Sequence, residues 1–164
     1  MMASAAQFLL PLAPLVWVAL GAVFVMLLDA VVDGQERERS LLAPLTAAVL
    51  CIAAVLAVAG FRHADVPAPV QVQQFLATDR LALFSDALIF GASALIVLLA
   101  GGYLREHQRE EGELYVLLLL GALGGAVFAR AADLMTLFVG LETLSLAVYA
   151  LVASRKTSAR ATEG

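Results

Sequence analysis

The chain has 164 residues, of which 62% are hydrophobic and 15% charged, and its mean hydropathy is +0.93. This composition excludes a soluble domain, because a fold of this length cannot cover so much apolar surface. The formal net charge is −4, and the charges lie mostly between apolar stretches, so nothing indicates a nucleic-acid partner. A single cysteine, Cys51, excludes a disulfide framework and a cysteine-based metal site.

Five apolar stretches are long enough to cross a bilayer as helices, for which about 20 residues suffice. The first has Pro11 and Pro14 in its opening turns, where proline is tolerated, and it is too long for the core of a signal peptide. The sequence therefore predicts an all-α transmembrane fold that forms one membrane unit over the whole chain. The predicted spans are residues 8–32, 41–61, 81–104, 114–130 and 134–153.

The connections between the predicted spans differ in length and character. Residues 62–80 contain two prolines and three glutamines, which leaves an extended segment and an interfacial loop as open alternatives. Within them, Thr78 and Asp79 predict the start of a helix. The four-residue link RAAD, residues 130–133, is so short that the fourth and fifth spans should form an antiparallel hairpin. Arg130 is expected to snorkel to the membrane interface.

Two predicted spans besides the fifth carry a carboxylate. Asp29, near the far end of the first span, is expected at the interface. Asp86 lies about two turns inside the third span, where a structural or interfacial role and a place on a proton path both stay open. The fourth span carries Gly121, Gly124 and Gly125, and small residues at this spacing allow another helix to approach closely.

The fifth span has a carboxyl group near its centre. Glu142 follows Asp133 by nine residues, which at about 1.5 Å each puts it about 13 Å deep in a ~30 Å hydrocarbon core. An ionised carboxylate at that depth costs at least a few kcal/mol, so it should be paired, protonated or next to water inside a protein bundle. Glu142 is therefore the main candidate for a functional residue.

Helical spacing places other polar residues near Glu142. Ser145 and Tyr149 share its face, which is expected to point toward other helices, and they are weaker site candidates. Thr136, Gly140 and Thr143 form a neighbouring strip of small residues. The structural alternative is a protonated Glu142 that only donates a hydrogen bond to an adjacent helix.

Lysine and arginine residues are unevenly distributed between the two sides of the membrane. With the amino terminus outside, seven of the ten lie on the inner side and three on the outer side. Cytoplasmic connections carry an excess of these residues. The sequence therefore predicts a multi-pass protein with an external amino terminus and a cytoplasmic carboxyl-terminal tail.

Residues 103–155 carry a recognisable series of motifs. A charged turn ending in GELY leads into the glycine-bearing span, and Asp133 then precedes LMTLFVGLETLSLAVYALVA, residues 134–153. Earlier in the chain, TDRLALF opens the third span. These motifs closely resemble the N subunit of bacterial NADH:quinone oxidoreductase, respiratory complex I. Ala147 departs from the pattern, because the family often has proline there.

The resemblance implies the amino-terminal part of an antiporter-like, proton-translocating subunit of about fourteen helices, ending before a sixth span. It implies the bacterial plasma membrane as location and other membrane subunits of complex I as partners. NADH, flavin, iron–sulfur clusters and quinone would belong to those partner subunits, with no cofactor or metal in this chain. Glu142 would be the glutamate that pairs with a lysine of the seventh span in a proton half-channel coupled to quinone reduction. Lys156, the only lysine of the chain, lies in the tail.

Two other interpretations stay open on the sequence. The chain is alternatively an antiporter-like subunit of a cation/proton antiporter complex or of a membrane-bound hydrogenase. A structural or assembly protein with five spans is the second alternative, and Glu142 would then only connect helices.

Overall fold

The computed structural model describes residues 11–31, 41–61, 69–106 and 112–160, without the side chains of residues 103–106 and 154–160. In these ranges five helices are long and apolar enough to cross a membrane, which confirms the expected all-α fold. The third and fifth helices continue beyond the expected ends of their spans. The helices are α2 (Ala13–Val31), α4 (Leu42–Gly60), the short α5 (Val70–Gln73), α6 (Arg80–Glu106), α7 (Gly112–Arg130) and α8 (Leu134–Arg160).

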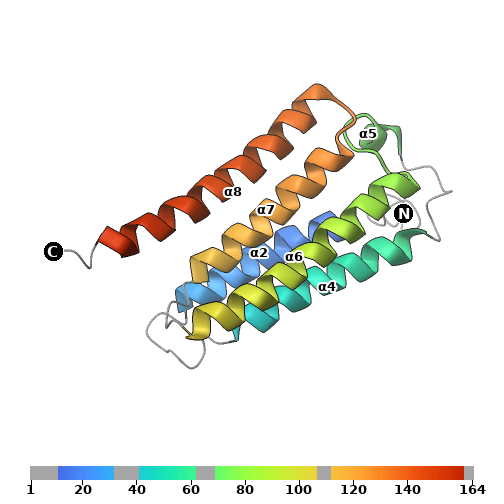
Figure 1. Cartoon of the computed structure of the whole chain (residues 1–164). Coiled ribbons are helices and arrows are strands. Elements are labelled where there is room, and N and C mark those ends of the chain that lie inside the picture. Colours follow the sequence, from blue (N-terminus) through green and yellow to red (C-terminus); the bar gives the residue numbers. More distant parts are fainter. Residues whose placement is uncertain (1–10, 32–40, 62–68, 107–111, 161–164) are drawn as a thin grey trace.

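Four of the long helices form a bundle, and the fifth lies outside it (Figure 1). Helix α2 packs on α4 and α7, and α6 also packs on α4 and α7, so these four helices close a ring. Fully buried side chains from all four helices fill its core, among them Val18, Leu50, Phe90 and Leu119. We refer to α2, α4, α6 and α7 as the four-helix bundle.

Helix α8 packs almost entirely on α7, at the edge of the molecule in Figure 1. Only 11% of its membrane-spanning stretch is buried, compared with 33–44% for the other four helices. Large apolar side chains such as Leu134, Phe138 and Leu146 are more than half exposed. Most of the surface of α8 is therefore available for further contacts.

Two facing glycines bring α7 and α8 into backbone contact. A Cβ atom on Gly124 would lie 2.6 Å from the backbone nitrogen of Leu144, and one on Gly140 would lie 2.5 Å from that of Phe128. Neither position has room for a side chain, since real Cβ atoms do not approach backbone so closely. Gly121 and Gly125 have only ordinary contacts, so Gly124 alone in the fourth span requires glycine for this crossing.

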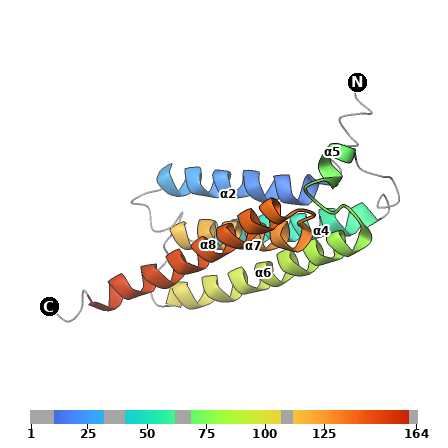
Figure 2. The same ribbon diagram turned by 90° about the horizontal axis from the view of Figure 1, so that it is seen from above.

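The described part of the long connection, from Pro69 onward, lies across one end of the bundle, as seen from above in Figure 2. It forms α5 and then an isolated antiparallel bridge between Leu76 and Ala131. Asp79 accepts a hydrogen bond from the backbone N–H of Ala82 at 2.9 Å, which caps α6 and confirms the predicted helix start. Residues 62–68, the rest of this connection, lie outside the described residues.

Candidate functional site

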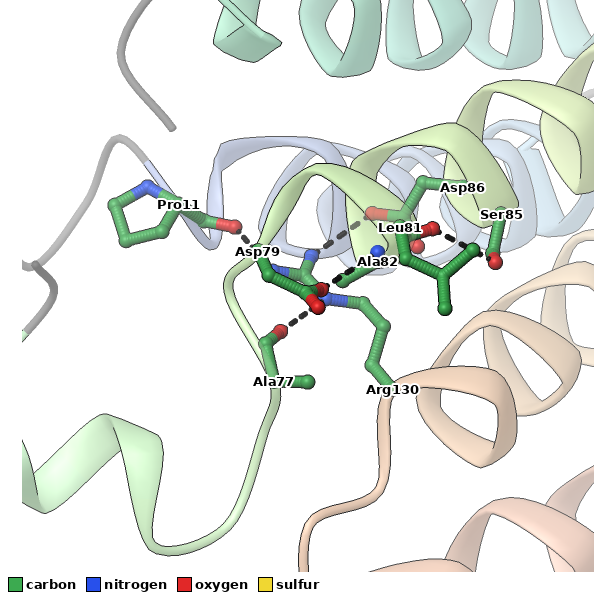
Figure 3. A network of polar contacts seen from close by, with 8 residues as sticks. All are labelled: Pro11, Ala77, Asp79, Leu81, Ala82, Ser85, Asp86 and Arg130. Carbon is green, nitrogen blue, oxygen red and sulfur yellow. Dashed lines mark hydrogen bonds and ion pairs between the residues drawn. The ribbon is translucent and has the colours of Figure 1, made fainter. Parts of the chain in front are cut away.

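The side chain of Arg130, at the end of α7, is fully buried. Figure 3 shows that it points toward Asp86, Pro11 and Ala77. Its Nη1 donates a hydrogen bond to Asp86 Oδ2 at 2.8 Å, and the two side chains form an ion pair. Its Nη2 donates to the Pro11 carbonyl at 2.8 Å, and its Nε donates to the Ala77 carbonyl at 3.0 Å. The expectation that Arg130 snorkels to the interface is wrong, because three acceptors inside the protein replace water.

Asp86 is equally buried, on the face of α6 that points into the bundle. A buried carboxylate is tolerated when an opposite charge and hydrogen bonds compensate for lost hydration, and Arg130 supplies both. The second carboxylate oxygen, Oδ1, has no hydrogen-bond partner among the described residues. Asp86 therefore lies in an ion pair within the protein and has no exposed surface.

Asp133 positions the first turn of α8. Its Oδ1 accepts hydrogen bonds from the backbone N–H groups of Met135 at 2.7 Å and Thr136 at 3.0 Å. Its Oδ2 accepts from the Thr136 hydroxyl at 2.6 Å. These hydrogen bonds favour the ionised form, those from Thr136 most of all, and they lower the pKa of Asp133 below its ordinary value of 3.8. Asp133 is thus an N-cap that stays charged at neutral pH.

Glu142 is exposed on α8, on the side that faces away from α7. Successive helical residues differ by about 100°, so Glu142 lies about 200° around the helix from Gly140, which touches α7. Tyr149, 69% exposed, shares the outward side, and Ser145 between them is half-buried. Glu142 forms no ion pair with any residue that the structure describes. The sequence predicted that the face with Glu142 would point toward other helices. The helices α2, α4, α6 and α7 do not cover this face, so they are not the predicted neighbours.

The four candidate site residues therefore fall into two separate places. Asp86 lies inside the four-helix bundle, whereas Glu142, Ser145 and Tyr149 lie on α8 outside it. No continuous polar path between the two places follows from these positions.

Asp29 is half-buried in α2, next to Gly112 at the start of α7.

Sequence reasoning missed the pairing of Arg130 with Asp86, although the signal was available. Helices α6 and α7 are antiparallel, so the start of the one and the end of the other lie at the same side of the membrane. An unpaired charge near each of those ends predicts an ion pair.

The described residues contain no group of three His, Cys, Asp or Glu side chains that could hold a metal ion.

Known proteins resemble this chain along most of its length, although no family model matches it. NADH-quinone oxidoreductase subunit N 1 of Sorangium cellulosum (strain So ce56) is 40% identical over 164 residues, covering 92% of this chain and 31% of the relative. Subunit N of Ectopseudomonas mendocina (strain ymp) is 37% identical, covering 90% and 29% respectively. That of Alkalilimnicola ehrlichii is 34% identical, covering 92% and 30%. The chain thus spans about three tenths of these relatives, and it belongs to the family of NADH-quinone oxidoreductase N subunits.

Proposed function

We propose that this chain takes part in proton translocation by an NADH:quinone oxidoreductase, with Glu142 as the proton-exchanging group. The observation that carries the proposal is the position of Glu142. It lies at mid-depth in a membrane-spanning helix and faces away from every other described helix. A carboxyl group there needs a polar or cationic partner from elsewhere, since exposure to acyl chains would be costly.

The relatives offer a source for that partner. They extend over about three times the length that this chain spans, so the rest of such a subunit has ample length to cover α8. We expect a lysine from that remainder to face Glu142, since the only lysine here, Lys156, follows the last span. The small-residue face of α8 is used by α7, and the face with Glu142 is left for this contact.

The chemistry requires that the partner moves and that the side of the membrane with access to Glu142 changes as it does so. While an ammonium group lies beside Glu142, the carboxylate is stabilised in its ionised form. When that group withdraws, the carboxylate takes up a proton, and when the group returns, the proton is released. Access from opposite sides of the membrane in the two states gives net transfer. Ser145 and Tyr149 have hydroxyl groups that would extend hydrogen bonding from Glu142 along the same helix.

The other parts of the activity are assigned to partner subunits. Other membrane subunits of the complex would adjoin this chain, and NADH, flavin, iron–sulfur clusters and quinone would be bound elsewhere in the complex. The membrane is the bacterial inner membrane, with the amino terminus outside and the tail in the cytoplasm. The distribution of lysine and arginine, seven inside and three outside, supports this orientation.

The test is Glu142→Gln in the full-length subunit within its assembled complex. Glutamine keeps the shape and hydrogen bonding of the side chain but cannot exchange a proton, so the protons pumped per NADH oxidised should fall by more than half. Pumping is measured in sealed vesicles together with the amount of assembled complex. Glu142→Asp is the matched control, because it keeps a carboxyl group and should retain part of the pumping. Normal assembly with unchanged pumping in Glu142→Gln would disprove the proposal.

A further inference from the structure

We infer that Arg130 is a positioning residue for Glu142, because it fixes the start of α8 and hence the direction of the helix that carries the glutamate. Helix α8 depends on such a fixed point, since it lies outside the four-helix bundle and packs almost entirely on α7. Its direction is therefore determined by its connection to α7 and by the crossing at Gly124 and Gly140.

The connection is held by the segment before α6. The backbone N–H of Ala77 donates to the Arg130 carbonyl at 2.7 Å, and the N–H of Ala132 donates to the Phe75 carbonyl at 2.9 Å. Arg130 is bound to Ala77 a second time, through its side-chain Nε. We call this pairing of residues 75–77 with residues 130–132, together with the Arg130 side chain, the entrance clamp.

The Arg130 side chain connects the entrance clamp to the bundle. Its Nη1 binds Asp86 on α6, and its Nη2 binds the Pro11 carbonyl just before α2. One fully buried guanidinium thus ties the α7–α8 link to the beginnings of two bundle helices. The planar group with several donors can hold these three acceptors at once, which a single-point charge does less well.

The distance from the entrance clamp to Glu142 makes the fixed point important. Glu142 lies eight residues beyond Leu134, or about 12 Å along the helix axis. A tilt of about 10° at the start of α8 would displace the carboxyl group by about 2 Å, and displacements of about 1 Å can already impair a catalytic geometry. Proton exchange with a partner on another helix would be affected accordingly. This consequence rests on the proposed function, whereas the fixed direction of α8 does not.

The experiment measures the direction of α8 in the full-length subunit within its complex. Nitroxide labels are attached to cysteines replacing Leu41 and Val152, both exposed here, with Cys51 replaced by alanine. Val152 lies 18 residues beyond Leu134, about 27 Å along α8, so a small tilt changes the distance between the labels clearly. The distribution of this distance is measured by double electron–electron resonance.

Removing the charge of Arg130 should loosen α8. We expect Arg130→Met, or the milder Asp86→Asn, to widen the distance distribution about twofold in the complexes that assemble, since a buried pair loses one partner. Arg130→Lys should restore part of the narrow distribution, because lysine keeps the positive charge but cannot hold all three acceptors as the planar guanidinium does. The matched control is Thr46→Val, which changes another fully buried polar residue, one whose hydroxyl has no described partner, and it should leave the width unchanged.

The outcomes separate this inference from the proposed function. A width like that of the wild type in both Arg130→Met and Asp86→Asn overturns the positioning role, and so does equal widening in Thr46→Val. If Arg130→Met widens the distribution while Glu142→Gln pumps normally, the positioning role stands and the proton-exchange role fails. If both roles are correct, Arg130→Met also lowers the protons pumped per NADH oxidised, and Arg130→Lys recovers part of the loss.

Discussion

At the scale of single residues, charged side chains in this protein serve different purposes according to what surrounds them. Arg130 and Asp86 are both completely buried and compensate each other at 2.8 Å. Glu142 is exposed and has no ion-pair partner within the described chain. A buried pair is tolerated because its partners replace hydration, whereas an isolated carboxyl group in a membrane needs a partner from outside. This contrast distinguishes the buried ion pair from the proposed functional site.

The cap formed by Asp133 leads to a prediction at this scale. Asp133→Ala removes the acceptors for the N–H groups of Met135 and Thr136, so both amides should exchange hydrogen faster in the full-length subunit. The pKa of Asp133 is lowered in the folded protein, so its contribution to stability is present above the unfolded value of 3.8 and is lost as the pH falls through the lower folded value. The difference in amide protection between wild type and Asp133→Ala should therefore stay constant from about pH 5 to 8.

Hydrogen exchange followed by mass spectrometry checks this prediction on the peptides that begin α8. Asp133→Asn is the matched control, because asparagine keeps one side-chain oxygen as an acceptor and should protect the amides better than alanine. Equal protection of residues 135 and 136 in wild type and Asp133→Ala would show that the cap does not hold the first turn.

At the scale of elements, the hairpin of α7 and α8 depends on the contact between Gly124 and Gly140. Within a membrane, close packing between helices replaces the missing hydrophobic driving force. The same contact determines which way Glu142 points, because Gly140 and Glu142 lie two positions apart on one helix. Ala147, buried on the side of α8 that packs on α7, extends this contact by a further two turns. A continuous helix passes through Ala147.

Gly140→Ala should separate the two helices. The added Cβ would lie 2.5 Å from the Phe128 backbone nitrogen, and overpacking of this kind typically destabilises by about 1–3 kcal/mol. We therefore expect a lower midpoint of thermal unfolding for the purified full-length subunit. Gly91→Ala is the matched control, since a Cβ there meets no atom within 4 Å and alanine favours helix. A Gly140→Ala variant as stable as Gly91→Ala would contradict the close crossing.

At the scale of the whole molecule, the long helices that the structure describes form a four-helix bundle with α8 on its outside. The bundle closes on itself, whereas α8 has only 11% of its span buried, which matches a subunit whose relatives are about three times as long. The ends of the helices also define two opposite sides of the molecule. Residues 69–79, the beginning of α2 and the α7–α8 link lie together at one side, joined by Arg130.

The orientation of these two sides can be tested by chemical labelling. Gln71 is exposed at the side of the entrance clamp, so a Gln71→Cys variant in a Cys51→Ala background should react with a membrane-impermeant maleimide added outside intact cells. Leu41→Cys, at the opposite side, should react only after the membrane is permeabilised. The reverse pattern would show that the amino terminus is cytoplasmic, against the distribution of lysine and arginine.

The sequence by itself determined the class of fold and the family, because both depend on local properties. The length of the apolar stretches predicts the membrane spans, and the motif around residues 134–153 is contiguous in the chain. Both the fold class and the family can therefore be predicted without the tertiary structure. Only the tertiary structure decided the partners of charges far apart in the chain. Arg130 and Asp86 are separated by 44 residues, and their pairing depends on which helices adjoin and on the segment that covers their ends. The outward direction of Glu142 likewise depends on which face of α8 packs on α7, and packing between two helices is a property of both.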